Sequence, residues 1–187
     1  MYDPARHHRR SIRLAGFDYT RAGAYFVTIR SHQGSCIFGE EQEGELFLTR
    51  WGEILREEWL RGAIVRPYVK LDRYVIMPNH MHGILVIERP VRATRRVAPH
   101  PSPESPRPCG PPSGSLGAIL GQFKSVTTKR IRAAAHDPSL DVWHRGYYER
   151  IIRDTTDWTR VRVYISENPK QWDRDPENPG MRPRRSR

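Results

Sequence analysis

The chain has 187 residues, with 32 Lys and Arg against 21 Asp and Glu, and its formal net charge is +11. This length suits one domain with appendages, and the excess of positive charge indicates a polyanionic partner. No apolar run approaches the roughly 20 residues that span a bilayer, and no signal-like apolar stretch follows the basic start, so we expect a cytoplasmic protein without a membrane partner.

The first half of the chain predicts four strands and one helix. Aromatic, β-branched and apolar residues mark the strands, which are residues 23–31, 44–49, 69–77 and 80–87. Apolar residues at helical spacing predict an amphipathic helix at residues 51–60. Pro78 and Asn79 predict a turn between the last two strands, because proline cannot donate to a central ladder and asparagine tolerates turn geometry.

The second half begins with a proline-rich segment, residues 89–114, which holds 8 of the 16 prolines and almost no large apolar side chain. Such a segment cannot pack a core and is predicted to be a mobile, basic connection. A helix at residues 115–135 and a strand at residues 142–152 follow. The last helix is predicted to begin at Asp154 or Thr155, which are good caps, and to end at Pro169.

This order of elements predicts an α+β fold with a mostly antiparallel sheet. We divide the chain into a basic N-terminal segment (1–22), a single domain (23–172) interrupted by the proline-rich segment, and a basic C-terminal tail (173–187). The tail is predicted to be extended, and disordered at its end.

His80 and His82 interrupt the apolar pattern of the run "VIMPNHMHGILVI". Side chains of a strand alternate between its two faces, so both imidazoles project from one side, about 7 Å apart along the strand. Two imidazoles placed in this way can converge on one metal ion. The alternative, which is the commoner case for an isolated pair, is that both histidines only form hydrogen bonds near a sheet edge.

The last helix supplies candidate partners for the histidines. Tyr164 and Asn168 are four residues apart, so that a phenol and an amide oxygen share one face of the helix. The alternative for Tyr164 is packing with its hydroxyl at the rim. Asn168 precedes Pro169 and is therefore expected to leave the α region.

Together these four side chains would suit the cleavage of a phosphodiester. A metal ion would polarise the phosphate while the phenol oxygen attacks phosphorus, forming a covalent phosphotyrosine that stores the bond for rejoining. The ion should be divalent: Mg²⁺ prefers oxygen ligands, whereas two imidazoles suit Mn²⁺ better.

Several ordered segments carry a resemblance to a known family. They are "HHRRSIRLAGFDYTRAGAYFVTIRS", "LDRYVIMPNHMHGILVI", "GQFKSVTTKRI", "VWHRGYYERIIR", and "VYISENPKQW" leading into "DPENP". With "HMH" and one late tyrosine, the chain resembles the single-tyrosine transposases of the IS200-like type, and within them the REP-associated tyrosine transposases. This resemblance implies a ferredoxin-like sandwich, in which helices flank a central antiparallel sheet (the HUH nuclease fold).

The resemblance also implies roles for the candidate residues. His80, His82 and Asn168 would bind the divalent metal ion (Mg or Mn), and Tyr164 would be the nucleophile. The Asn at position 168 agrees with the REP-associated branch, since insertion-sequence relatives usually have Gln there. The family cuts and rejoins single-stranded DNA beside hairpins through a 5′-phosphotyrosine and a free 3′-OH. We expect a monomer or a homodimer.

Other residues of the basic surface are candidates for contacts with DNA. Tyr147 and Tyr148 are alternative nucleophiles on a strand, but packing or base stacking is the predicted role for such aromatics. The predicted DNA contacts are Lys124, Arg145, Arg150 and Arg153 to phosphates, and Trp143 and Tyr148 to bases. Two other functions stay open: a non-catalytic protein that binds structured nucleic acid, and a nicking nuclease of the replication-initiator or relaxase type.

Overall fold

The computed structural model describes residues 17–42, 45–88 and 110–181. In these parts of the chain, six strands, three α-helices and three short 3₁₀ helices follow one another. The start of the predicted N-terminal segment (1–16), most of the proline-rich connection (89–109) and the end of the tail (182–187) lie outside the described residues. No helix of the described parts is long and apolar enough to cross a membrane.

A four-stranded antiparallel sheet forms the centre of the molecule, in the order β4-β5-β1-β6. Its strands are β1 (Gly23–Arg30), β4 (Val69–Ile76), β5 (His80–Ile87) and β6 (Tyr148–Ile152). The two central strands, β1 and β5, are rich in the apolar and aromatic residues that favour a covered position in a sheet. The predicted α+β class is therefore confirmed.

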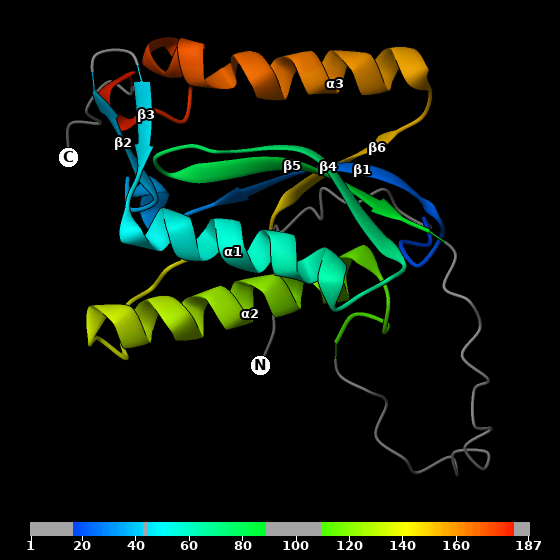
Figure 1. Cartoon of the computed structure of the whole chain (residues 1–187), viewed down its shortest axis with the longest axis horizontal. Helices are drawn as coiled ribbons and strands as arrows, with labels where there is room; N and C mark the ends of the chain where they lie inside the picture. Colours follow the sequence, from blue (N-terminus) through cyan, green and yellow to red (C-terminus); the bar gives the residue numbers. More distant parts are fainter. Residues whose placement is uncertain (1–16, 43–44, 89–109, 182–187) are drawn as a thin grey trace, which may run out of the picture.

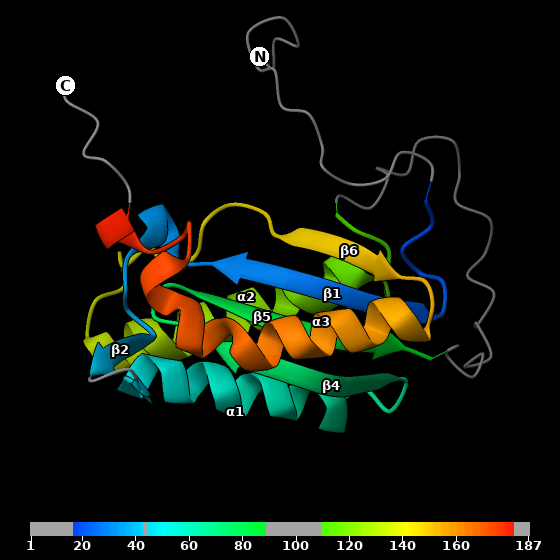
Figure 2. The same ribbon diagram turned by 90° about the horizontal axis from the view of Figure 1, so that it is seen from above.

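The helices cover the two faces of this sheet unequally. The helices α1 (Arg50–Ile64) and α2 (Leu116–Ala135) lie together on one face, and α3 (Thr155–Glu167) lies on the other (Figure 1). Figure 2 is a view from the α3 side, in which α3 lies over the sheet and runs roughly along its strands. The larger apolar cluster lies between the sheet and α1 and α2, and a smaller one lies under α3.

Each of the three helices begins at a polar side chain that accepts a hydrogen bond from the first turn. Thr49 accepts from the Gly52 N–H, Ser115 from the Ala118 N–H, and Asp154 from the Asp157 N–H. Such caps satisfy backbone donors that have no partner within the helix. The predicted start of the last helix is confirmed.

Two predicted strand assignments need correction. The strand predicted at residues 142–152 is wrong before Tyr148, because the carbonyl oxygens of His144 and Gly146 accept hydrogen bonds from the Lys124 ammonium and Gly146 has φ +88°. The strand β2 (Gly39–Gln42) is absent from the prediction, since its sequence "GEEQ" is polar. It pairs with β3 (Glu45–Leu48) in a separate two-stranded sheet.

The chain continues past α3 in an ordered form. Asn168 is the C-cap of α3, so the helix ends before Pro169 as predicted, but Asn168 keeps helical backbone angles (φ −54°, ψ −42°) and the expectation that it leaves the α region is wrong. The 3₁₀ helix η2 (Asn168–Arg174) tolerates Pro169 in its first turn, where a missing N–H costs no hydrogen bond. A second 3₁₀ helix, η3, is Pro179–Met181, so the prediction of an extended tail is wrong for residues 173–181.

Candidate active site

Two buried histidines form the centre of the candidate site. His80 and His82 lie on β5 and face α3, whereas Met81 between them packs into the larger apolar cluster on the other face. The Nε2 atoms of the two imidazoles are 3.0 Å apart. The alternation of the strand therefore brings both rings together, as the sequence predicts.

The other ring nitrogen of each histidine has a protein partner. Nδ1 of His80 lies 2.8 Å from Oδ1 of Asn79, and Nδ1 of His82 lies 2.8 Å from the Thr28 hydroxyl on the neighbouring strand β1. Both Nε2 atoms are thereby directed away from these partners and toward each other. Partners of this kind orient imidazoles at metal sites.

The helix α3 brings Tyr164 to this pair. Val161 and Ile165 anchor the helix in the smaller apolar cluster, and Tyr164 lies at its edge with 49% of its surface exposed. Its hydroxyl is 3.3 Å from Nε2 of His82. The ring of Phe26 packs against both His82 and Tyr164, with centroid distances of 5.4 and 5.8 Å.

Asn168 follows Tyr164 by one helical turn. Its backbone N–H donates to the Tyr164 carbonyl, and its side chain is buried. The Oδ1 atom of Asn168 has no hydrogen-bond partner in the described part of the chain. A buried amide oxygen without a partner costs about 1–3 kcal/mol, and a bound cation would satisfy it.

Sequence reasoning missed one acidic side chain at the site. Asp175 is buried just after η2, and its Oδ2 lies 3.7 Å from Nε2 of His80. Its Oδ1 accepts the backbone N–H of Glu177. The segment "DPENP" is part of the resemblance, but only the ordered path of η2 brings its first residue to the histidines.

The ionisation of the site follows from its burial. Burial, and next the charge of Arg30, lower the pKa of His80 to about 4, while burial and then His80 lower the pKa of His82 to about 3. Burial, and next the carboxylate of Asp175, raise the pKa of Tyr164. At neutral pH both imidazoles are thus uncharged and the phenol is protonated.

The donor atoms fit a divalent metal ion. Two nitrogens that are each about 2.1 Å from one ion and at a right angle are about 3.0 Å apart, which is the observed Nε2–Nε2 separation. Among residues 17–42, 45–88 and 110–181, no group of three or more His, Cys, Asp and Glu side chains is arranged to hold a metal. The Oδ1 atom of Asn168, which has no hydrogen-bond partner in the described part of the chain, is available as a further ligand.

Four of the predicted DNA contacts lie on or near the edge strand β6. Tyr148 pairs with Thr28 in the register and so shares the face of His82, with 49% of its surface exposed. Arg150 lies on the same face but forms an ion pair with Asp157 of α3. Arg153, just after β6, is exposed, as is Arg145 before it.

Lys124 and Trp143 have structural partners. The Lys124 ammonium donates to the carbonyls of His144 and Gly146, and burial lowers its pKa to about 8. The Trp143 indole donates to the Thr127 hydroxyl, and its ring packs against the larger apolar cluster. Both hold the loop before β6, and their predicted contacts with DNA stay predictions.

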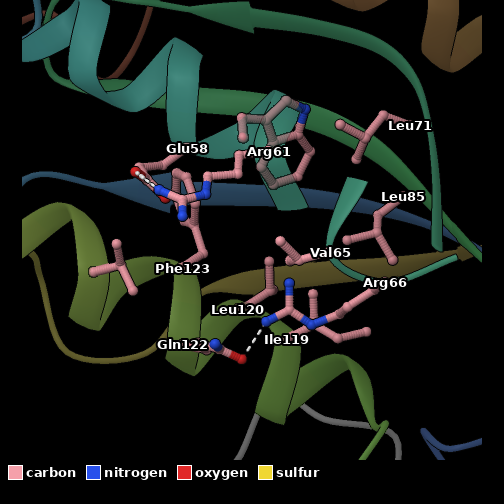
Figure 3. A pocket seen from close by; sticks show the side chains of 12 residues that line it. Glu58, Arg61, Val65, Arg66, Leu71, Leu85, Ile119, Leu120, Gln122 and Phe123 are labelled. Carbon is pink, nitrogen blue, oxygen red and sulfur yellow. Dashed lines mark hydrogen bonds and ion pairs between the residues drawn. The ribbon is translucent and has the colours of Figure 1, made fainter. Parts of the chain in front are cut away.

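A cavity of about 220 Å³ lies between α1 and α2, on the face away from the histidines. Its lining includes Trp59, Leu85 and Phe123, and none of the predicted site residues (Figure 3). At its mouth, Arg66 donates a hydrogen bond to Gln122. This cavity does not reach the histidine face, so it is not part of the candidate site.

Comparisons with known proteins find relatives by sequence and by fold. No family model matches the chain. An uncharacterized protein of Haemophilus influenzae is 35% identical over 174 residues, which cover 93% of this chain and 95% of the relative. The structure of a REP-associated tyrosine transposase bound to a REP hairpin aligns with a TM-score of 0.53 at 19% identity, over 84% of this chain and 73% of that chain. The fold implied by the resemblance is confirmed.

Proposed function

Since this chain belongs to the same family as the Haemophilus influenzae protein and has the fold of the REP-associated tyrosine transposases, we propose that it is a metal-dependent transposase of single-stranded DNA. It cleaves and rejoins DNA beside hairpin repeats through a 5′-phosphotyrosine. One observation carries this proposal: the Tyr164 hydroxyl lies 3.3 Å from Nε2 of His82, which is itself 3.0 Å from Nε2 of His80.

In this proposal the phenol oxygen of Tyr164 attacks the phosphorus of the scissile phosphodiester. A bond forms between that oxygen and phosphorus, the bond from phosphorus to the 3′-oxygen breaks, and the phenol proton leaves while the 3′-oxygen takes up a proton. Rejoining is the reverse attack by a free 3′-OH. A divalent ion bound at His80, His82 and Asn168 would polarise the phosphate and neutralise developing charge.

The protein's own groups prepare this step. Because their pKa values lie at about 4 and about 3, the two imidazoles are uncharged at neutral pH. Each ring then has one nitrogen lone pair that can bind a metal ion. Burial and Asp175 raise the pKa of Tyr164, so a cation beside it would offset both effects and favour the phenolate. The half-exposed position of Tyr164 leaves it accessible to a polymer.

The proposed partner is single-stranded DNA that carries a hairpin. The net charge of +11 supports a polyanion, and the fold neighbour was solved with a REP hairpin. On this chain, Tyr148 is the proposed DNA contact on the face of the histidines, and the proposed phosphate contacts are Arg150 on β6 and the exposed Arg145 and Arg153, before and after this strand.

The test is the detection of a covalent adduct. The purified chain is incubated with single-stranded oligonucleotides taken from inverted repeats beside its gene, with Mn²⁺ or Mg²⁺, and separated under denaturing conditions. We expect an adduct that EDTA prevents, that peptide mass spectrometry places on Tyr164, and that falls at least about a thousand-fold in Tyr164→Phe. Tyr148→Phe is the matched control, because it removes an equally exposed phenol hydroxyl on the same face but keeps the ring that is proposed to stack on a base.

Three results would contradict the proposal. An adduct that persists in Tyr164→Phe would reject the nucleophile. Hairpin binding that falls steeply with salt, without cleavage under either metal, would favour a non-catalytic binding protein. Nicking at a replication origin rather than beside a repeat would favour an initiator or relaxase.

A further inference from the structure

Asn79 occupies the turn between β4 and β5, and all of its side-chain hydrogen-bonding groups are used. The residue is 1% exposed. Its Nδ2 group donates to the carbonyl oxygens of Gly34 (3.0 Å) and Glu177 (2.7 Å), and its Oδ1 lies 2.8 Å from Nδ1 of His80. One side chain thereby links the loop after β1, the segment after η2 and the first histidine of the site.

These bonds leave one arrangement of protons on His80. Two carbonyl oxygens can only accept, so the group that meets them is the NH₂ group of Asn79 and the atom that meets His80 is the amide oxygen. An amide oxygen also only accepts, so Nδ1 of His80 must carry a hydrogen. A neutral imidazole has a single N–H, and Nε2 of His80 is left with its lone pair.

We propose that Asn79 is a positioning residue that holds His80 in the Nδ1–H tautomer and presents its Nε2 lone pair to the site. This inference rests on the proposed function only where it says that the lone pair binds a metal ion. The tautomer itself follows from the hydrogen bonds of Asn79.

Thr28 gives His82 no comparable restriction. A hydroxyl both donates and accepts, so Thr28 can serve either tautomer of the His82 imidazole. In the metal-free protein, the 3.0 Å contact between the Nε2 atoms then requires that His82 donates its N–H to the lone pair of His80. With a metal ion at Nε2 of His82, the N–H of this ring would be at Nδ1, where the Thr28 hydroxyl would accept it.

The backbone around Asn79 is held independently of its side chain. The carbonyl oxygens of Pro78 and Asn79 accept the backbone N–H groups of Phe38 (2.9 Å) and Ser31 (2.8 Å). Replacement of the side chain therefore leaves the turn anchored. This separation allows a variant that changes the tautomer without unfolding the strand.

The experiment reads the tautomer directly, by long-range ¹H–¹⁵N correlation spectra of the ¹⁵N-labelled, metal-free protein at neutral pH. In the unmodified chain we expect Nδ1 of His80 to be the protonated nitrogen. Asn79→Leu removes the acceptor and should convert His80 partly or fully to the Nε2–H tautomer. Asn79→Asp keeps an acceptor but loses both donors, and should retain the Nδ1–H tautomer.

Metal affinity gives a second readout, from titration with Mn²⁺ alone. Loss of such a partner typically weakens metal binding about 10–100-fold, which we expect for Asn79→Leu but not for Asn79→Asp. For the measurement of the tautomer, Thr28→Val is the matched control. It removes the hydrogen-bond partner of His82 and should leave the tautomer of His80 unchanged.

An Nε2–H tautomer of His80 in the unmodified, metal-free protein would overturn the proposal, even if a variant failed to fold. So would an unchanged His80 spectrum in a folded Asn79→Leu variant. Neither result depends on DNA cleavage. Conversely, an Nδ1–H tautomer with no covalent adduct on any DNA would support the role of Asn79 and reject the proposed function.

Discussion

The two faces of the central sheet are built from the same strands but filled in different ways. On the face of α1 and α2, side chains such as Tyr25, Met81 and Leu85 join one large apolar cluster. On the face of α3, the apolar cluster is smaller and gives way to His80 and His82. Neighbouring residues of β5 therefore contribute to stability on one face and present polar groups on the other.

This difference shows where burial needs a functional explanation. Buried apolar surface stabilises the fold by roughly 25 cal/mol per Å², so the stability that it contributes is enough to account for the burial of side chains on the face of α1 and α2. Buried imidazoles and the Asn168 oxygen, which lacks a hydrogen-bond partner in the described part of the chain, gain no comparable stability. The proposed cation and phosphate site would account for these groups, because a bound ligand would offset their cost.

The largest expected effect on stability is on the apolar face. Leu85→Ala removes a fully buried side chain from the larger cluster and should lower the free energy of unfolding by about 2–5 kcal/mol. Urea unfolding followed by circular dichroism measures it. At a temperature where the variant is folded, its Mn²⁺ affinity should stay within about threefold. A cost below about 1 kcal/mol would mean that the two faces do not differ as described.

A smaller loss of stability is expected from a substitution at the contact between α3 and the edge strand β4. The Asp72 carboxylate accepts hydrogen bonds from the Trp158 indole (2.5 Å) and from two guanidinium nitrogens of Arg162 (2.7 and 2.8 Å). Asp72→Asn weakens these charge-assisted bonds and should cost about 1–2 kcal/mol. Because α3 carries Tyr164, formation of the adduct should slow as well.

The pH dependence checks the cause of this effect. The hydrogen bonds from Arg162 lower the pKa of Asp72 from its ordinary value of 3.8. The stability that the carboxylate contributes is therefore present above about pH 5 and is lost as the pH falls below 3.8 and through the folded-state pKa. The free energies of unfolding of the original chain and Asp72→Asn should converge in acid, and a constant difference down to pH 2 would point to packing instead.

The elements with a clear periodic pattern could be predicted from the sequence. The histidine strand and the last helix are both where periodicity, caps and Pro78 place them, and so is the face that His80 shares with His82. Period two fixes which side chains share a face, and i, i+4 spacing fixes which helical residues are neighbours. These rules suffice to pair His80 with His82 and Tyr164 with Asn168, but only the fold brings the two pairs together.

What the sequence could not predict depends on long-range contacts. The approach of Asp175 to His80 requires the path of η2, and the loss of strand structure before Tyr148 requires Lys124 to reach two carbonyls from another helix. The polar strand β2 forms only because β3 pairs with it. In each case tertiary contacts override the local propensity.

The smallest change in the free energy of unfolding is expected at His82, on the face of α3. His82→Leu replaces a buried imidazole with an apolar side chain of similar size, and it removes the imidazole's contacts with the Thr28 hydroxyl, Nε2 of His80 and the Tyr164 hydroxyl. Because leucine gains apolar burial, the free energy of unfolding should change by less than about 1 kcal/mol in either direction, while Mn²⁺ binding and the adduct are lost. Paired urea unfolding and Mn²⁺ titration measure both. If His82→Leu instead costs as much as Leu85→Ala and leaves Mn²⁺ binding intact, the histidine is part of the structural core, and the two faces of the sheet have the same role.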